Sequence, residues 1–317
     1  MQAAVLHEFG PTLSVEEVPR PVPGPDDVLI EVEVCGVCHS DLHIVEHYFS
    51  GSPLPLVLGH EVAGELPSGE RVLVYSPWGC GGCAWCREGH EAICPDSREA
   101  GIISDGGYAD YMLVPHRRYL LPLGDLDPVD AAPLTCGGVT AFRAVKHAQP
   151  LVRAGDRVAV IGAGGLGQYA LQTLRLTTDA HVIAIDPSAE KRARALELGA
   201  HEAAAPGELD GRVRGVIDFV GAESTIREAA GLVDRKGIVV VAGLFGGQVP
   251  FGFGAVPHEA RFMTTVWGSI QDLAELIGLA QREGTRHTVE RMPLTEAQAA
   301  HDRLRSGAAQ GRIVLGP

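Results

Sequence analysis

The stretch from Cys38 to His43 gathers a thiol, two imidazoles, a hydroxyl and a carboxylate in the order Cys-His-Ser-Asp-Leu-His. Thiolate sulfur and imidazole nitrogen are ligands that a borderline-soft ion such as Zn²⁺ accepts. Cys38 and His60 could supply two ligands of a zinc site, and Cys136, far along the chain, could supply the third. Three protein ligands leave a fourth position open for chemistry. The alternative for Cys136 is a small buried apolar residue.

Other groups around these residues could assist the chemistry. Asp41 could accept a hydrogen bond from a ligand imidazole, or it could cap the turn that begins there. Ser40 and His43 lie one helical turn apart and could carry a proton from a buried alcohol to solvent, unless His43 is an ordinary surface histidine. Glu61 could approach the metal or change the electric field around it. His39 could face an anion instead of a metal ion.

A second group of thiols occupies one glycine-rich loop with the spacing C-x2-C-x2-C-x7-C. Four thiolates this close in sequence predict a closed tetrahedral zinc site, which is structural because no position stays open. An iron–sulfur cluster is the rival assignment. A zinc ribbon for nucleic acid is disfavoured because Glu88 and Glu91 outnumber the one cation of the loop, Arg87. The four ligands are Cys80, Cys83, Cys86 and Cys94.

A buried strand over residues 156–161 runs into the sequence Gly-Ala-Gly-Gly-Leu-Gly and then into a helix. This context predicts a dinucleotide-binding turn, with the pyrophosphate at the helix N-terminus. A second strand ends in Asp186, whose carboxylate would bind the adenosine ribose and repel a 2′-phosphate, so NAD is favoured over NADP. A tight strand–helix turn without a ligand is the alternative. The cofactor-binding residues of the turn are Gly162, Gly164, Gly165, Leu166 and Gly167.

The elements that position these motifs are of two kinds. Alternating apolar and polar residues predict strands over residues 2–6 and 28–34, and strand character returns between 101 and 123. From residue 156 onward strands alternate with helices, as in a doubly wound parallel sheet. Helices are predicted over 128–145, 189–198, 224–232, 271–282 and 295–306, and further strands over 213–220, 237–242, 265–268 and 312–315.

Length and composition restrict the class of protein. The chain has 317 residues, 45% of them apolar, which is enough for two domains with buried cores. Its net charge of -14 disfavours nucleic acid and anionic membranes as partners. No apolar run approaches the length of a bilayer span and no secretion signal opens the chain, so we expect a cytoplasmic protein without a membrane partner.

Together these motifs resemble the zinc-dependent medium-chain alcohol dehydrogenases over essentially the whole chain. The order is specific: Cys-Gly-x-Cys-His-Ser-Asp-x-His, Gly-His-Glu, the four-cysteine loop, a third ligand, then the glycine-rich turn and Asp186. Residues 74–80, 133–135 and 218–226 look most like the bacterial branch that handles secondary alcohols and ketones. Some members of that branch have Asp as the third ligand, where this chain has Cys136.

The resemblance implies an α/β fold. A GroES-like, β-rich catalytic domain of residues 1–133 and 269–317 would surround a Rossmann NAD-binding domain of residues 134–268, built on a doubly wound parallel sheet. Two segments, 64–71 and 199–213, look shorter than is usual in the family. The resemblance also implies a homo-oligomer, a dimer or a tetramer, paired through the edge of the Rossmann sheet near residues 239–243.

The same resemblance implies roles for individual residues. Cys38, His60 and Cys136 would bind a catalytic zinc ion, and the four-cysteine loop would bind a structural one. Ser40 would bind the substrate hydroxyl, and His43 would release its proton by way of the cofactor ribose. The remaining assignments are His39 and Arg312 at the pyrophosphate, Lys191 with Asp186 at the adenosine ribose, Gly243 and Leu244 at the nicotinamide, and Phe49, Trp78 and Trp267 in the substrate pocket.

The expected activity is reversible hydride transfer between NAD and a small alcohol, preferably a secondary one, with a ketone or aldehyde as the product. A polyol or aldehyde dehydrogenase of the same fold is one alternative. A nucleotide-binding relative without chemistry is another, but grouped ligand residues mark a site and argue against it.

Overall fold

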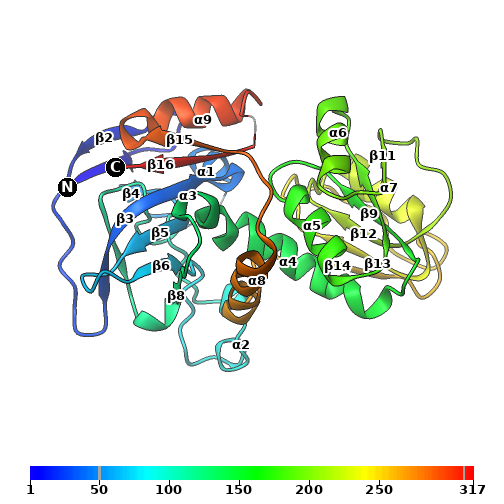
Figure 1. The fold of residues 1–317 in the computed structure, drawn as a ribbon, viewed down its shortest axis with the longest axis horizontal. Helices are drawn as coiled ribbons and strands as arrows, with labels where there is room; N and C mark the ends of the chain where they lie inside the picture. Colours follow the sequence, from blue (N-terminus) through cyan, green and yellow to red (C-terminus); the bar gives the residue numbers. More distant parts are fainter. Residues whose placement is uncertain (49–50, 310) are drawn as a thin grey trace. The chain divides into compact units, whose positions relative to one another are not determined.

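The chain passes from one structural unit to a second and back again (Figure 1). The computed structural model describes residues 1–48, 51–309 and 311–317. Unit 1 comprises Met1–Val139 and Gly268–Pro317, and unit 2 comprises Thr140–Trp267. From the sequence we placed these boundaries after residues 133 and 268.

Unit 1 contains the β-rich part of the chain, built from both of its ends. Its larger sheet has the order β15-β16-β3-β5-β6-β8, with β7 paired to β3, and its smaller sheet has the order β2-β1-β4. The C-terminal strand β16 pairs antiparallel with β3, so distant parts of the sequence lie side by side (Figure 1). The strands are β1 (Gln2–Leu6), β2 (Ser14–Glu17), β3 (Val28–Val37), β4 (Leu56–Val57), β5 (Glu61–Glu65), β6 (Arg71–Val74), β7 (Tyr111–Val114), β8 (Leu120–Pro122), β15 (Val289–Pro293) and β16 (Arg312–Gly316).

The helices of unit 1 are short, apart from α8. Asp41 stands in the first turn of α1, and Ser269 caps α8 by accepting the N–H of Asp272. Within the described part of the chain, no helix combines the length and the apolar character that crossing a bilayer requires. The helices are α1 (His39–Val45), α2 (Ala84–Arg87), α3 (Pro128–Ala131), α8 (Ile270–Glu283) and α9 (Ala297–Arg305).

Residues 128–145 do not form the single continuous helix that the sequence predicted. After α3 comes a 3₁₀ turn, and Cys136 (φ −125°, ψ −73°) leaves the helical conformation before α4 (Gly137–Ala148) begins. Pro133 is the physical reason, because it lacks the N–H that a continuing helix would need. The prediction of one helix was wrong, and the break leaves Cys136 at a bend.

Unit 2 is a doubly wound, fully parallel sheet of six strands in the order β11-β10-β9-β12-β13-β14. Apolar side chains from the sheet and from α7 form a continuous core, in which Ile183, Ile185 and Val239 are each 0% exposed. The strands are β9 (Arg157–Ile161), β10 (His181–Ile185), β11 (Glu202–Ala204), β12 (Val213–Asp218), β13 (Val233–Val241) and β14 (Arg261–Thr264), and the helices are α5 (Gly167–Thr177), α6 (Ala189–Glu197) and α7 (Glu223–Leu232).

The end of unit 2 differs from the sequence prediction in two respects. The last strand is β14, which ends at Thr264, and not a strand over 265–268; Trp267 has a φ of 51°, in the left-handed region that a strand does not use. Strand β13 pairs with β12 on one side and β14 on the other. Residues 239–243 therefore do not lie at the edge of the sheet, and the predicted pairing edge was wrong.

Two connections are short. Strands β5 and β6 are joined by residues 66–70, closed by a bond from the Leu66 N–H to the Glu70 carbonyl. In unit 2, residues 205–212 connect β11 to β12, and this fully described segment contains no helix. A doubly wound sheet usually has a crossover helix at such a connection.

Candidate active site

Four residues from three segments of unit 1 come together in a buried cluster. Cys38 stands between β3 and α1, His60 and Glu61 stand at the start of β5, and Cys136 stands at the bend before α4. One possible ligand atom from each of them lies within 4.8 Å of those of the other three, and all four residues are buried. We call these four residues the metal cluster.

The geometry of the metal cluster suits zinc. The Sγ atoms of Cys38 and Cys136 are 4.0 Å apart. Two sulfur ligands at about 2.3 Å from a tetrahedral Zn²⁺ would be about 3.8 Å apart. The hydrogen bond with Cys136 holds the pKa of the Cys38 thiol well below its usual range, and the same bond raises the pKa of Cys136. A divalent cation would replace the remaining thiol proton.

Asp41 fills both of the roles that the sequence left open. Its Oδ2 accepts the backbone N–H of Cys38 at 2.8 Å, which satisfies the N-terminus of α1. Its Oδ1 lies 3.2 Å from Nδ1 of His60. Burial acts to lower the pKa of His60, but the charges and hydrogen bonds of Asp41 and Cys38 together outweigh burial and raise it. With Nδ1 directed at Asp41, Nε2 of His60 is the nitrogen that would bind a metal.

Tyr108 belongs to this arrangement, although no role for it could be predicted from the sequence. Its hydroxyl donates to Oδ2 of Asp41 at 2.9 Å. Its ring packs on the backbone of Gly59, the residue before His60: a Cβ at Gly59 would lie 2.4 Å from Cδ1 of the ring. The two contacts together hold the backbone of His60 and the carboxylate that orients its ring.

His301, on α9, is a second residue that the sequence analysis missed. Its side chain is 0% exposed, and its ring meets the Tyr108 ring edge-to-face, with centroids 5.9 Å apart and an angle of 70°. Neither ring nitrogen has a hydrogen-bond partner in the described part of the chain. Burial lowers the pKa of His301 and favours its neutral form. A histidine in an otherwise ordinary helix pattern gives no sequence signal for this contact.

Glu61 is held by Arg312, the residue that the resemblance placed at the pyrophosphate. The Arg312 guanidinium donates to both carboxylate oxygens of Glu61, and both side chains are buried. Burial raises the pKa of Glu61 to about 7, although the positive charge of Arg312 acts in the opposite direction. The carboxylate therefore stands beside the other cluster residues with a guanidinium as its counter-ion.

The other residues of the predicted catalytic segment lie on α1. Ser40 and His43 are both partly buried on this helix, and His39 is exposed. The ring of His43 lies 5.1 Å from that of Tyr48. Phe49 lies outside the described residues.

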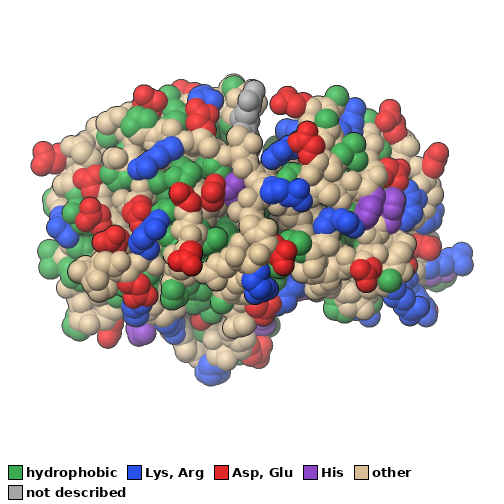
Figure 2. All heavy atoms as spheres, in the orientation of Figure 1, with side chains coloured by type: hydrophobic (Ala, Val, Ile, Leu, Met, Phe, Trp, Pro, Cys, Tyr) green, Lys and Arg blue, Asp and Glu red, His purple; other side chains and the backbone are tan. Residues whose placement is uncertain are grey.

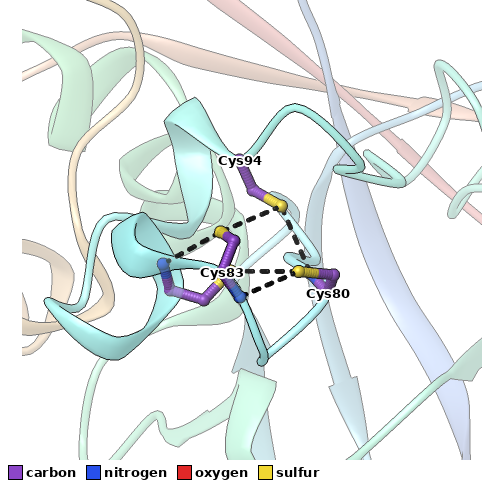
Figure 3. Close-up of side chains that lie close together, drawn as sticks. Cys80, Cys83 and Cys94 are labelled. Atoms are coloured by element: carbon purple, nitrogen blue, oxygen red, sulfur yellow. Dashed lines mark hydrogen bonds between the residues drawn. The ribbon is translucent and has the colours of Figure 1, made fainter.

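The four-cysteine loop forms a second cluster in unit 1 (Figure 3). The Sγ atoms of Cys80 and Cys86 are 4.0 Å apart, and those of Cys83 and Cys94 are 3.8 Å apart. These distances agree with the spacing of about 3.8 Å for sulfur atoms around a tetrahedral Zn²⁺. Backbone N–H groups, first that of Gly82, lower the pKa of Cys80 to about 7, which favours the thiolate that a metal binds.

The two tryptophans assigned to the substrate pocket are both buried. Trp78 donates from Nε1 to the Tyr75 carbonyl at 2.9 Å. It lines a cavity of about 530 Å³ whose lining includes none of the metal-cluster residues. Trp267 is 7% exposed and follows β14.

The glycine-rich turn of unit 2 follows β9 and opens α5, as the sequence indicated. Gly167 permits the close approach of the helix to the turn, since a Cβ there would lie 2.0 Å from the Gly162 carbonyl oxygen. Asp186 follows β10, and its Oδ2 accepts the N–H of Ala163 in the turn at 2.9 Å. Nζ of Lys191 lies 4.0 Å from the position of a Cβ on Gly164. The structure thus brings the turn, Asp186 and Lys191 together.

Gly243 and Leu244 lie at the carboxyl end of β13 in the same unit. The Gly243 N–H donates to the carbonyl of Asp218, at the end of the neighbouring strand β12. Leu244 is 36% exposed. The carboxyl ends of strands are where α/β sheets bind ligands.

Comparison with known proteins identifies the family. Residues 24–125 match the family described as "Alcohol dehydrogenase GroES-like domain", and residues 165–282 match "Zinc-binding dehydrogenase". An NAD-dependent alcohol dehydrogenase of Sulfurisphaera tokodaii is 36% identical over 349 aligned positions that cover 100% of both chains. A D-arabinose 1-dehydrogenase (NADP(+)) of Saccharolobus solfataricus is 32% identical, over 100% of this chain and 97% of that one.

A solved structure gives the same result. The alcohol dehydrogenase of the hyperthermophilic archaeon Aeropyrum pernix matches with a TM-score of 0.93 at 33% identity, covering 100% of each chain. The fold is therefore a GroES-like domain with a Rossmann-like nucleotide-binding domain. The likeness extends over the full length of the chain, and the chain belongs to the zinc-dependent medium-chain alcohol dehydrogenase family.

Proposed function

We propose that this protein oxidises a small alcohol, preferably a secondary one, to a ketone or aldehyde, and catalyses the reverse reaction. NAD would accept the hydride, and zinc would occupy the metal cluster. The observation that carries the proposal is the metal cluster itself: two thiols, an imidazole and a carboxylate, all buried, within 4.8 Å of one another. The full-length likeness to an NAD-dependent alcohol dehydrogenase supports it.

In this proposal Cys38, His60 and Cys136 hold the catalytic zinc, which supplies a Lewis acid that lowers the pKa of an alcohol. The alcohol loses a hydride to NAD and a proton to the protein, leaving a carbonyl, NADH and a proton. Ser40 accepts the hydroxyl proton and His43 passes it towards solvent. Asp41 keeps the His60 ring in one orientation, and the four-cysteine loop holds the second zinc.

The assignment of NAD rests on Asp186 and the turn beside it. Asp186 already accepts the N–H of Ala163, and its negative charge disfavours a 2′-phosphate at the adenosine ribose. Lys191 would contribute to the same ribose site. We also propose a homo-oligomer in the cytoplasm, and light scattering on the purified protein would distinguish a dimer from a tetramer.

The experiment that tests the function follows NADH absorbance. NAD is added to zinc-replete protein with a panel of secondary, primary and polyol alcohols, and the panel is repeated with NADP. We expect the highest rate with NAD and a secondary alcohol, and we expect a chelator to abolish it. No rate with any alcohol, in protein shown to contain two zinc ions per chain, would favour the nucleotide-binding role without chemistry.

The chain offers a matched pair of variants for this test. Cys38→Ser removes a proposed ligand, whereas Cys35→Ala alters a buried cysteine of β3, three residues earlier, that is not a member of the metal cluster. We expect Cys38→Ser to lose activity and one zinc ion per chain, and Cys35→Ala to keep both. Equal activity in the two variants would remove Cys38 from the site.

A second candidate substrate class is a sugar or polyol. The D-arabinose 1-dehydrogenase relative, which matches this chain over its full length, is the observation that favours it. A higher kcat/KM for an aldose or polyol than for any simple alcohol of the panel would replace the secondary alcohol in the proposal.

A further inference from the structure

A pocket of unit 2 lies at the amino ends of its strands, at the end of the sheet opposite to the glycine-rich turn. Its volume is about 390 Å³. Arg157 begins β9, and the glycine-rich turn follows the last residue of that strand, Ile161. The pocket and the turn are thus separated by the length of the strand, about 13 Å at the usual rise per residue. We call it the arginine pocket; it is lined by Arg153, Gly155, Asp156, Arg157, Arg212, Val213, Arg214 and Asp234.

Main-chain carbonyl groups anchor three of its guanidinium groups. Arg157 donates to the Asp210 carbonyl at 2.8 Å. Arg214 donates from Nε to the Leu151 carbonyl at 2.9 Å and from Nη1 to the Arg235 carbonyl at 3.2 Å. Arg212 donates from Nη1 to the carbonyls of Gly231 and Val233. Carbonyl oxygens fix the orientation of these groups without neutralising their charge, and other N–H groups of Arg212 and Arg214 stay available.

The carboxylates of the pocket leave this positive charge largely uncompensated. Asp156 accepts the backbone N–H of Arg153, and Asp234 accepts that of Arg235. Among the described residues, the four arginines make one ion pair, between Arg157 and Glu202 at 3.4 Å. The Arg153 guanidinium has no partner in the described part of the chain.

This cationic pocket contrasts with the charge of the whole chain, which is -14. The space-filling view shows Lys and Arg side chains among the acidic ones over the surface of unit 2 (Figure 2). The helix-free connection 205–212 ends at Arg212, so the short connection leads directly into the pocket. Four guanidinium groups against three carboxylates, those of Asp156, Asp234 and the Glu202 that pairs with Arg157, leave an excess of about one positive charge, the sign that a phosphate group requires.

We propose that the arginine pocket binds one small phosphate-bearing anion per chain. Guanidinium groups present paired N–H donors that fit the oxygen atoms of a phosphate group. Because three of the four are already oriented by main-chain carbonyls, little side-chain freedom is lost on binding. Ligand binding here would stabilise the folded protein by mass action and would not need the nicotinamide site.

Isothermal titration calorimetry of the zinc-loaded enzyme with inorganic phosphate tests the proposal. Saturating NAD is present, so that the glycine-rich turn is occupied, and a second arm uses pyrophosphate to distinguish a monophosphate from a diphosphate. We expect one site per chain, with affinity falling steeply as salt is added. No binding of either anion would overturn the proposal.

Three variants locate the site. Arg153→Ala breaks no internal bond, and Arg212→Ala removes an anchored guanidinium; we expect each to weaken binding by about tenfold or more. The matched control is Arg227→Ala, an exposed arginine of α7 in the same unit that pairs with Glu223. Binding that survives Arg153→Ala and Arg212→Ala, or that weakens equally in Arg227→Ala, would place the anion elsewhere and overturn the proposal.

Discussion

At the scale of single residues, the metal cluster depends on side chains that are not ligands. Asp41 joins three groups with its two oxygens: the Cys38 N–H, the Tyr108 hydroxyl and Nδ1 of His60. Burial makes each of these contacts stronger than it would be in water, and makes the loss of any one of them more costly. The cysteines and the histidine of the metal cluster could be selected from the sequence because Cys and His at such spacing are typical of metal sites. The Tyr108 contact spans 67 positions and gave no local signal.

Tyr108→Phe tests this support. The variant removes one donor to Asp41, which should loosen the orientation of His60 and raise the rate of zinc loss from the metal cluster severalfold. The overall cost in stability should be about 1 kcal/mol, as for one buried hydrogen bond. Transfer of zinc to a chromophoric chelator measures the rate. The kinetic phase that reports zinc release from the metal cluster is the one that is missing in Cys38→Ser.

Tyr75→Phe is the matched control for that experiment. It also deletes a fully buried hydroxyl, which donates to the Gly268 carbonyl at 2.7 Å, but this hydroxyl does not contact Asp41. If Tyr75→Phe and Tyr108→Phe release zinc at the same rate, the contact with Asp41 has no special effect on the metal cluster.

Ser40→Ala tests the proposed proton path. Removal of the hydroxyl should lower kcat by about 10²–10⁴-fold, the usual contribution of a positioned proton-transfer group. Zinc content should stay at two ions per chain, because Ser40 is not a member of either metal-binding group. Steady-state kinetics and metal analysis of the same preparation measure both quantities, and unchanged turnover would remove Ser40 from the path.

At the scale of elements, the sequence predicted the kinds and the order of most helices and strands, because their apolar periodicity is strong. It failed where single residues depart from the conformation of the helix or strand that the composition predicted, as at the break that follows Pro133. Cys136 interrupts a stretch with helical composition, and Trp267 adopts a positive φ just after β14. The sequence also did not predict that β14 pairs with β13 at the edge of the sheet, because the residues of a strand do not determine its position in the sheet order. The sequence predicted that Cys38, His60 and Cys136 lie together, but it did not predict the contact of α9 with Tyr108.

His301 on α9 supports a prediction about pH. Burial lowers its pKa in the folded state below the ordinary value of about 6.5 that applies when the chain is unfolded. Just below pH 6.5 the unfolded chain therefore binds a proton that the folded chain does not. Its contribution to stability is complete above about pH 6.5 and is lost as the pH falls towards the lowered pKa, with a slope of at most about 1.4 kcal/mol per pH unit.

His301→Leu should flatten this pH dependence in that window. The groups that face His301 are Tyr108, Asp41, Arg305 and Asp302, and all of them remain in the variant. Urea unfolding of the zinc-loaded protein at a series of pH values measures the slope. The control is His258→Leu, which replaces an exposed histidine. A slope in His301→Leu equal to that of the unaltered protein would show that His301 is already protonated when folded.

At the scale of the whole molecule, the two compact units divide the chemistry between them. All residues of both metal-binding groups belong to unit 1, whereas the glycine-rich turn and Asp186 belong to unit 2. The chain passes between the units within α4, directly after Cys136. Zinc should therefore stabilise one unit and the nucleotide should be bound mainly by the other.

Hydrogen exchange measured by mass spectrometry, with and without a strong chelator, tests this division. Residues 80–94 contain only the four-residue α2 and a three-residue 3₁₀ turn, so the four thiolates and their metal supply most of the cross-linking in that loop. Removal of zinc should accelerate exchange there by more than about tenfold, which corresponds to a loss of about 1.4 kcal/mol in local stability. The buried strands β9, β10 and β12 hold no metal ligand and have a continuous apolar core, so their exchange should stay unchanged. Acceleration in these strands equal to that of the loop would mean that the two units unfold as one and that zinc stabilises the whole chain.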